Sequence, residues 1–297
     1  MISIIISSVN KQQLTDVKEN IKQTIGVAYE LIAIDNSSGE KGVCEIYNAG
    51  AKLAKYGIFC FMHEDVKIHT NNWGVILHKI FSENSEFGLV GIAGSQYKAL
   101  TPSSWNCYDI NTSNAYYFNL IQDFKYDSKE KTISRSNPTD VRLAKVASID
   151  GVWMCCTRKS FQSYHFDQNL LKSFHGYDVD FSLGMNQNYE VAVTFEVLIE
   201  HFSEGNFDAN WLKDILKVHK KWNYMLPLNF TDITEYDLVK DEKRAFKNVL
   251  KKMWKLGFKS SDMCSAIYNS RQSRIFNFSL ILKLYSQLFK LLFKKRN

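Results

Sequence analysis

The chain has 297 residues, 45% hydrophobic and 14% aromatic with only 3 prolines, a composition that excludes a disordered or low-complexity protein. Its charge is divided unevenly: residues 240–297 contain 15 Lys+Arg against 3 Asp+Glu, whereas residues 1–239 contain 22 against 28. The mildly acidic body offers no broad basic face to a nucleic acid. The basic end predicts an anionic partner, either a membrane surface or a nucleic acid.

The cysteines and the start of the chain indicate a reducing compartment. None of the 6 cysteines shows the paired spacing of a metal site, and we expect buried thiols. Met1 leads directly into a strand pattern rather than a signal peptide, and no apolar run of about 18 residues is free of charge. These features predict a cytoplasmic protein.

Strand and helix patterns alternate over the first 66 residues. Apolar, β-favouring runs at 2–9, 29–34 and 57–66 predict strands, and apolar residues recur at helical spacing over 10–25 and 41–55. Crossovers this short predict parallel strands. Neither a glycine-rich dinucleotide motif nor a phosphate-binding loop follows the first strand, so any nucleotide is held differently.

Acidic residues lie at the ends of two of these strands. The run at 57–66 closes with His63-Glu64-Asp65, and Asp35 and Asn36 follow the run at 29–34. Parallel strands bring these ends to one sheet edge, where open α/β sheets bind ligands, and oxygen ligands suit a hard divalent cation. Solvated residues after a strand would give the same pattern.

The pattern loosens after the third strand. The next predicted elements are a helix at 72–81, a strand at 88–93, a long loop at 94–142 with a hairpin (115–125 and 131–135), and a strand at 146–157 broken at Asp150-Gly151. The loop region also carries aromatic side chains at Trp105, Tyr108, Tyr116 and Tyr117. A loop of this length inside a globular domain is usually functional, so we expect it to line a site.

Two carboxylates open the next helix. The pattern predicts a helix at 177–187 with Asp178 and Asp180 in its first turn, where the helix dipole favours negative charge, so simple capping is one interpretation. A strand at 190–200 follows and ends at His201, which the pattern alone leaves as either a structural residue or a ligand.

The C-terminal part is helical and basic. Helical patterns cover 208–223 and 232–258, and a polar interval precedes a last apolar segment at 274–296 that is interrupted by lysines. Such a segment fits a helix lying in a membrane interface better than one spanning it, the alternative being a helix packed on the body or on a second copy. We therefore divide the chain into 1–225 and a helical extension at 226–297 with a basic amphipathic tail at 274–297.

Taken in order over residues 1–211, these stretches resemble the family-2 glycosyltransferases with the GT-A fold. The matching motifs are Ser7-Ser8-Val9-Asn10, Ile34-Asp35-Asn36-Ser37-Ser38, Asn48-Ala49-Gly50-Ala51, His63-Glu64-Asp65, Asp150-Gly151-Val152-Trp153, Tyr177-Asp178-Val179-Asp180, and the His201–Phe207 loop with Trp211 beyond it. The resemblance implies an α/β fold with a Rossmann-like, mostly parallel mixed sheet flanked by helices, extended here by C-terminal helices.

The resemblance also assigns roles to residues. It implies that the nucleotide is bound by Ser8, Asp35, Asn36, Asn48, His63 and Glu64, that Mn²⁺ or Mg²⁺ is held by Asp65 and His201, that Asp178 is the catalytic base, and that Gly151, Trp153 and Asp180 lie on the acceptor side. Two positions depart from the family pattern. His63 replaces the first acid of the Asp-x-Asp motif, and Tyr177 replaces the first acid at the helix start.

The function implied is inverting transfer of a sugar from a nucleotide-diphosphate sugar to a hydroxyl of a glycan or lipid-linked acceptor. Cell-surface polysaccharide or glycolipid synthesis is the expected setting, at the inner membrane face through residues 274–297 and without nucleic acid. The two departures leave a non-catalytic nucleotide- or glycan-binding protein as the alternative. A sugar nucleotidyltransferase is disfavoured, since residues 7–11 lack its glycine-rich, arginine-bearing loop.

Overall fold

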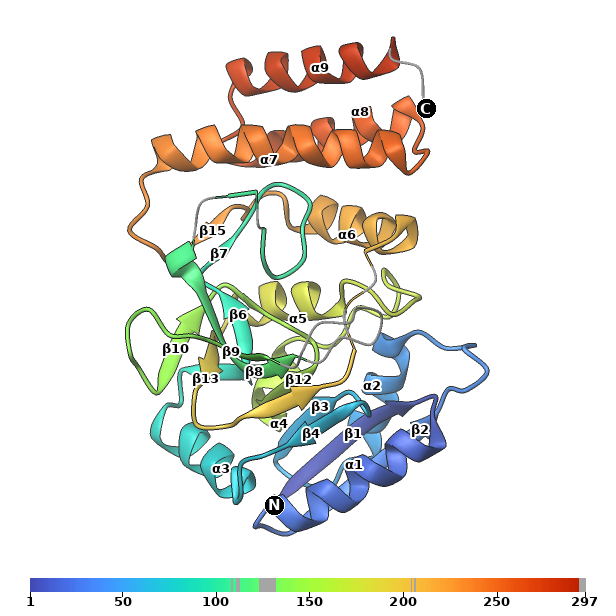
Figure 1. The fold of residues 1–297 in the computed structure, drawn as a ribbon, viewed down its shortest axis with the longest axis vertical. Helices are drawn as coiled ribbons and strands as arrows, with labels where there is room; N and C mark the ends of the chain where they lie inside the picture. The colour runs from blue at the N-terminus through green and yellow to red at the C-terminus, as the bar shows by residue number, and fades with distance from the viewer. Residues whose placement is uncertain (108, 111–112, 123–131, 204, 206, 294–297) are drawn as a thin grey trace.

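The computed structural model describes residues 1–107, 109–110, 113–122, 132–203, 205 and 207–293 (Figure 1). Its helices are α1 (Lys11–Thr24), α2 (Val43–Leu53), α3 (Trp73–Glu83), α4 (Arg158–Ser163), α5 (Tyr177–Met185), α6 (Ala209–Trp222), α7 (Glu235–Lys255), α8 (Ser260–Asn269) and α9 (Phe278–Leu292). Its strands are β1 (Ile2–Ser8), β2 (Tyr29–Asp35), β3 (Ile58–Met62), β4 (Val66–Ile68), β5 (Phe87–Gly91), β6 (Ala93–Ser95), β7 (Tyr97–Lys98), β8 (Tyr116–Gln122), β9 (Thr132–Ser136), β10 (Leu143–Val146), β11 (Ser148–Ile149), β12 (Trp153–Thr157), β13 (Glu190–Thr194), β14 (Ile199–His201) and β15 (Leu228–Asn229).

A seven-stranded mixed sheet in the order β10-β13-β5-β12-β3-β1-β2 forms the centre of the body. Strands β1, β2 and β3 pair in parallel, as predicted, and β12 runs antiparallel to both β3 and β5. The predicted α/β class with a mixed sheet flanked by helices is confirmed. Register pairs Ser8 with Asp35, so the ends of β1 and β2 lie side by side at one sheet edge.

The continuous apolar sequence of β1 reflects burial on both faces. Ile5 belongs to the core that includes α2 and α5, whereas Ile4 and Ile6 belong to the core that includes α1 and α3. Successive side chains of a strand point to opposite faces, so a single run of isoleucines contributes to two cores. Because both faces of the sheet are covered, ligands can reach it only at the ends of its strands.

A second sheet in the order β11-β6-β8-β14-β4 lies beside the first, and β9 adds to it by pairing with β8. The predicted hairpin is therefore present as β8 and β9, although Tyr108, Lys125 and Lys131 lie outside the described residues. The single strand predicted at 190–200 is wrong. It is two strands, because β13 pairs with β5 and β10 in the first sheet, whereas β14 pairs with β4 and β8 in the second.

The C-terminal helices α7, α8 and α9 form a layer at the top of the molecule (Figure 1). Their buried residues share a core with Leu212 of α6. Helix α8 lies where the sequence predicted only a polar interval, and its Met263, Ala266 and Ile267 were the helical signal that was overlooked. No helix among the described residues has both the length and the apolar character needed to cross a membrane.

Helix α9 is apolar on two sides. Leu280, Leu284, Leu288 and Leu291 are buried against α7 and α8. The opposite face is apolar but mostly solvent-exposed, and it carries Phe278, Leu282, Tyr285, Phe289, Leu292 and Phe293. Ile275, which precedes α9, is buried in the body, and residues 294–297 lie outside the described part of the chain.

Buried Glu242 fixes α7 to the body. Its carboxylate accepts hydrogen bonds from the Tyr97 hydroxyl at 2.6 Å, from the backbone N–H groups of Leu100 and Thr101 at 2.7 and 2.9 Å, and from the Thr101 hydroxyl at 2.5 Å. A buried carboxylate is tolerated only when its oxygens are satisfied in this way. The helical layer therefore depends on one polar contact as well as on its apolar core.

We expect Glu242→Ala to lower the free energy of unfolding by roughly 3 kcal/mol or more, because several buried donors lose their acceptor and each costs about 1–3 kcal/mol. The matched variant Glu235→Ala, at an exposed position of the same helix, should stay within about 0.5 kcal/mol of the parent. Urea unfolding followed by circular dichroism measures both. Equal stability of the two variants would contradict this role of Glu242.

Candidate functional site

His63, Asp65 and His201 meet at the carboxyl edge of β3. His63 follows β3, with its backbone N–H donating to the Val152 carbonyl at 3.1 Å, and Asp65 precedes β4. Antiparallel pairing of β4 with β14 sets His201 opposite Val66. The Asp65 Oδ1 atom is then 3.8 Å from Nδ1 of His63 and 3.6 Å from Nε2 of His201.

The three side chains fit a divalent cation. One ligand atom from each lies within 4.8 Å of the others, and the side chains are 14–17% exposed, so an ion could enter from solvent. Two imidazole nitrogens and a carboxylate oxygen are donors that divalent metals accept. The sequence placed Asp65 and His201 here but assigned His63 to the nucleotide, because His63 occupies an acid's position in the motif.

The electrostatics of the group favour ligation. Burial acts to raise the pKa of Asp65, but the nearby imidazoles of His201 and His63, together with the hydrogen bond from Ser203, hold that pKa well below its usual range. Burial and the proximity of His201 lower the pKa of His63 to about 4. The carboxylate is therefore ionised, and the imidazole of His63 neutral, near pH 7, which are the forms that bind metals.

Asp178 lies in the first turn of α5, half-buried. Burial, and then the negative charge of Asp150, raise the pKa of Asp178 to about 7. Asp150 is itself held in place by the Trp105 indole N–H at 2.7 Å and the Val152 backbone N–H at 2.8 Å. A carboxylate with a pKa close to neutrality is suited to accept a proton during catalysis.

The start of α5 is in contact with the cation group. The Tyr177 hydroxyl lies 2.7 Å from Nε2 of His63 and donates to the Gly151 carbonyl at 3.2 Å. A Cβ atom at position 151 would collide with the Tyr177 ring, so only glycine fits there. Gly151 thus permits this contact, and its predicted place on the acceptor side stays a prediction.

Asp180 does not reach the site, contrary to its predicted acceptor role. It is fully buried and accepts hydrogen bonds from the Tyr164 hydroxyl, the Lys221 ammonium and the Trp222 indole, each at 2.8 Å. These partners bind α5 to α6. Because all of its donors come from the protein, Asp180 has a structural role.

Trp153 also differs from its prediction. It is fully buried on the side of the sheet covered by α1 and α3, where its ring meets that of Trp73 edge to face at 6.1 Å between centroids. A side chain inside this core cannot stack on an acceptor sugar. In contrast Trp105, which donates to Asp150, is half-buried and lies in the long loop that the sequence expected to line a site.

Glu64 and Ser8 satisfy one another instead of facing a nucleotide. Glu64 is buried and accepts from the Ser8 hydroxyl at 2.7 Å and from the backbone N–H groups of Val9 and Asn10 at 2.9 and 2.8 Å. Both side chains thus have partners within the protein, and their predicted nucleotide-binding roles stay predictions. Their contact fixes the turn between β1 and α1 against the end of β3.

Asp35 and Asn36 lie at the sheet edge, and the Asn36 side chain is bound to the backbone of Lys41, donating to its carbonyl at 2.9 Å and accepting from its N–H at 3.1 Å. The exposed Asp35 accepts from the Ser37 backbone N–H at 2.9 Å, and this hydrogen bond is the main cause of its lowered pKa. Asn36 donates its backbone N–H to the Ser8 carbonyl at 2.7 Å. The loop therefore lies beside the end of β1, and its nucleotide-binding role stays a prediction.

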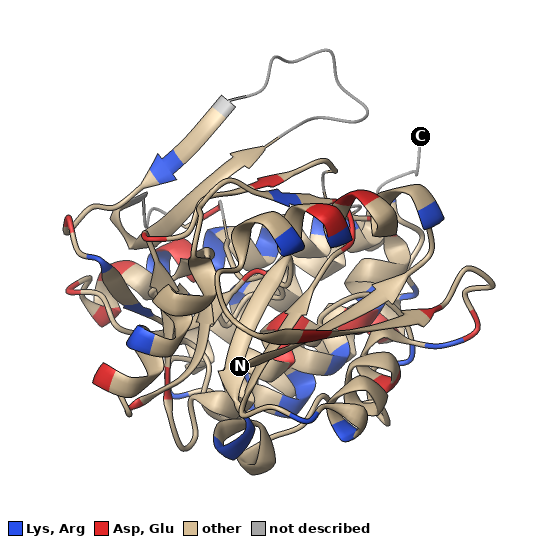
Figure 2. Cartoon of the chain, turned by 90° about the horizontal axis from the view of Figure 1, so that it is seen from below, with Lys and Arg blue, Asp and Glu red and all other residues tan. Residues whose placement is uncertain are grey.

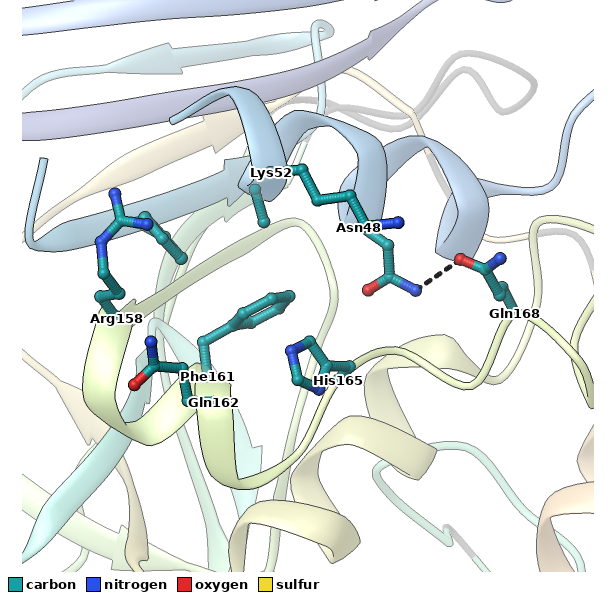
Figure 3. A pocket seen from close by; sticks show the side chains of 9 residues that line it. Asn48, Lys52, Arg158, Phe161, Gln162, His165 and Gln168 are labelled. Atoms are coloured by element: carbon teal, nitrogen blue, oxygen red, sulfur yellow. Dashed lines mark hydrogen bonds between the residues drawn. The ribbon is translucent and has the colours of Figure 1, made fainter. Parts of the chain in front are cut away.

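Asn48 lies in a different pocket (Figure 3). Its amide nitrogen donates to the Phe166 carbonyl and to the Gln168 side chain, both at 2.8 Å. The pocket has a volume of about 420 Å³ and is lined on its deep side by Phe59 and Phe161. Because Asn48 is held there, the prediction that it binds the nucleotide is not supported by its position.

Solved structures with the same arrangement of elements are GT-A glycosyltransferases. The part of S. aureus TarS from residue 1 to 349 matches with a TM-score of 0.57 and 10% identity, over 98% of this chain and 88% of that chain. The mannosyltransferase PcManGT from Pyrobaculum calidifontis, in complex with GDP-Man and Mn²⁺, matches with 0.51 and 10% over 99% and 87%. A structure of a longer TarS chain also matches, and there the match covers only 53% of the TarS chain.

The family follows from the sequence itself. The model of the glycosyltransferase-like family matches residues 3–224, and the chain belongs to this family. No curated protein shows significant sequence similarity to the chain. The resemblance deduced from ordered motifs is thus confirmed at the level of family and fold.

We expect the carboxyl group of Asp178 to titrate near pH 7, mostly protonated below that pH and mostly ionised above it. Asp150→Asn should lower this pKa, because removing a like charge favours the ionised form. Carboxyl ¹³C chemical shifts measured from pH 4 to 9 report the titration. An Asp178 pKa near the usual value of about 4 in the parent protein would contradict the expected burial effect.

Proposed function

We propose that the chain is a metal-dependent, inverting glycosyltransferase that moves a sugar from a nucleoside-diphosphate sugar to a hydroxyl group. The carrying observation is the pairing of a cation-binding group, His63, Asp65 and His201, with the near-neutral carboxylate Asp178, whose neighbour Tyr177 contacts His63. Similar solved structures support it, since TarS 1–349 was solved with UDP-GlcNAc, and PcManGT with GDP-Man and Mn²⁺.

Each part of the proposed site has a chemical task. His63, Asp65 and His201 would hold the divalent cation, which would supply Lewis-acid stabilisation of the charge on the leaving diphosphate. Asp178 accepts the proton of the acceptor hydroxyl as that oxygen attacks the anomeric carbon, assistance that is typically worth about 10²–10⁴ in rate. Attack opposite to the leaving group inverts the anomeric centre.

The donor's nucleoside is proposed to lie over the loop at Asp35 and Asn36, which adjoins the end of β1. Ser203 extends the cation group on the diphosphate side, because its hydroxyl donates to Asp65 at 2.7 Å. The matching loop from His201 continues through Gly205 and Phe207, while Glu204 and Asn206 lie outside the described residues. The acceptor is proposed to be a glycan or lipid-linked hydroxyl, in cell-surface polysaccharide or glycolipid synthesis.

Asp178→Asn should abolish sugar transfer while leaving donor binding within about threefold, since the amide cannot accept the proton yet preserves the shape of the side chain. Product formation from a panel of nucleotide sugars with Mn²⁺, and calorimetric binding of the same donors, measure the two effects. Asp180→Asn is not a suitable control, because Asp180 has a structural role. The control is Asp16→Asn, on the exposed side of α1.

Two results would count against the proposal. Transfer by Asp178→Asn at the parental rate would remove Asp178 from the mechanism. Donor binding by the parent without transfer to any acceptor or to water would favour the non-catalytic binding protein instead.

The exposed side of α9 supports a further part of the proposal, attachment to an anionic membrane at the inner face. Its aromatic and aliphatic side chains are apolar anchors of the kind found in interfacial helices. Lysines of α7 and α9 lie close together: burial, and then the charges of Lys243, Lys290, Lys283 and Lys251, lower the pKa of Lys247. The body shows acidic and basic positions interspersed (Figure 2). Positive charge beside apolar side chains fits anionic lipid headgroups.

Replacing Leu282 and Phe289 with serine should release the protein from vesicles of phosphatidylcholine and phosphatidylglycerol, because the exposed anchors are lost while the buried leucines of α9 remain. Leu53→Ser, an equally exposed leucine on α2, is the matched control and should bind like the parent. Vesicle flotation measures the bound fraction. Unchanged binding by the double variant, or equal binding to pure phosphatidylcholine, would contradict the proposal.

A further inference from the structure

The two departures from the family pattern, His63 and Tyr177, are in contact. They are 114 positions apart in the sequence, yet the Tyr177 hydroxyl lies 2.7 Å from Nε2 of His63. The Tyr177 side chain is buried, and its ring packs on Tyr47 and Phe166, which fixes its orientation. Each replacement taken singly removes a carboxylate from the site, but together they build a hydrogen bond.

The direction of that hydrogen bond follows from the number of protons available. A tyrosine hydroxyl has one proton, and that of Tyr177 is donated to the Gly151 carbonyl at 3.2 Å. The hydroxyl oxygen can then only accept from His63, so the proton of the neutral imidazole resides on Nε2. In the other tautomer the Gly151 carbonyl would lose its donor, and Nδ1–H would face Asp65 at 3.8 Å, too far for a hydrogen bond.

This tautomer leaves a lone pair on Nδ1 of His63, the atom that faces Oδ1 of Asp65. A histidine that binds metal commonly donates its other ring N–H to a fixed acceptor, which orients the ring. Gly151 and Tyr177 provide such a chain, which runs from a backbone carbonyl through the tyrosine hydroxyl to the imidazole. His63 is thus oriented as a ligand before any ion arrives.

We propose that His63 is a metal ligand, oriented by Tyr177, and that the set of His63, Asp65 and His201 selects a transition-metal ion such as Mn²⁺, Co²⁺ or Zn²⁺ over Mg²⁺. The inference deepens the proposed function by naming the class of cation, and it rests on the same site. Tyr177 is a positioning residue here, since it acts on the ion only through His63.

The selectivity follows from the donor atoms. Mg²⁺ prefers oxygen ligands and usually keeps several waters, so exchanging a carboxylate for an imidazole weakens its binding. Imidazole nitrogen suits the later first-row metals, whose affinities rise from Mn²⁺ toward Cu²⁺. Ligand atoms at about 2.0–2.2 Å from such an ion lie roughly 3–3.5 Å apart. The observed 3.6 and 3.8 Å require only a small inward movement of the side chains.

Metal binding to the intact chain tests the proposal without any sugar transfer. Calorimetry with Mn²⁺, Co²⁺ and Mg²⁺, and the visible absorption of bound Co²⁺, should show at least tenfold tighter binding of Mn²⁺ and Co²⁺ than of Mg²⁺. His63→Ala should weaken Co²⁺ binding by more than roughly 100-fold, since even the outer partners of a ligand are worth about 10–100-fold. Tyr177→Phe, which removes only the hydroxyl, should weaken it by about 10–100-fold.

Two further variants sharpen the test. His63→Asp supplies an oxygen in place of a nitrogen, and it should narrow or reverse the preference for Co²⁺ over Mg²⁺. His165→Ala removes an exposed histidine that lines the separate pocket, and it should bind each metal like the parent. Histidine ¹⁵N chemical shifts of the metal-free protein should show the proton of His63 on Nε2 in the parent, and this preference should disappear in Tyr177→Phe.

The inference is overturned if the parent binds Mg²⁺ as tightly as Co²⁺, or if His63→Ala keeps parental Co²⁺ affinity while remaining folded by circular dichroism. These outcomes are separable from failure of the proposed function. Selective metal binding without transfer from any nucleotide sugar would reject the enzyme and retain the ligand assignment. Metal-dependent sugar transfer by His63→Ala, with undiminished Co²⁺ affinity, would retain the enzyme and reject His63 as a ligand.

Discussion

The antiparallel pairing of β4 with β14 is the contact on which the site depends. It brings His201 beside Asp65, and it brings Ser203 to a carboxylate 138 positions earlier in the sequence. The short strand β4 continues from the end of β3, so the second sheet is joined to the first where the parallel strands end. A ligand site at this junction takes residues from both sheets. Loss of the pairing would remove His201 and Ser203 from the group and leave Asp65 with His63 alone.

The acidic residues near this junction fall into two groups according to the hydrogen-bond donors and charges that surround them. Glu64 and Asp180 are surrounded by protein N–H and O–H groups, so their charges are satisfied internally and they hold elements together. Asp65 has a serine and two imidazoles beside it, and Asp178 has the like charge of Asp150. The first pair stabilises the fold, whereas the second pair is the one to which we assign the proposed cation and the proposed proton transfer. The distance of a carboxylate from the site is therefore a poor guide to its role. The number of protein hydrogen-bond donors around it is a better guide.

Helix α9 of the helical layer has one side buried in a core and another apolar side exposed to solvent. The buried leucines of α9 complete a core with α7 and α8, and Glu242 fixes α7 to the body through a second, polar contact. The opposite side of α9 remains apolar and exposed, beside lysines. Packing alone does not require apolar residues there, so that face is available for a lipid surface.

The sequence by itself determined the alternation of strands and helices, the parallel order of β1, β2 and β3, and the family, because periodicity and motif order are local properties of a chain. It also put forward Asp65 and His201 as metal ligands, roles that stay predictions, and the structure brings these two side chains together. The sequence failed where no local signal marks a boundary: no glycine or proline separates β13 from β14, and α8 is short and polar on its surface. It did not reveal the burial of Ser8, Asn48, Glu64, Trp153 and Asp180, because motifs do not show which side of an element faces the core. Only the tertiary structure brought His63 and Tyr177 into contact, since a contact between distant residues depends on how the sheets and α5 pack.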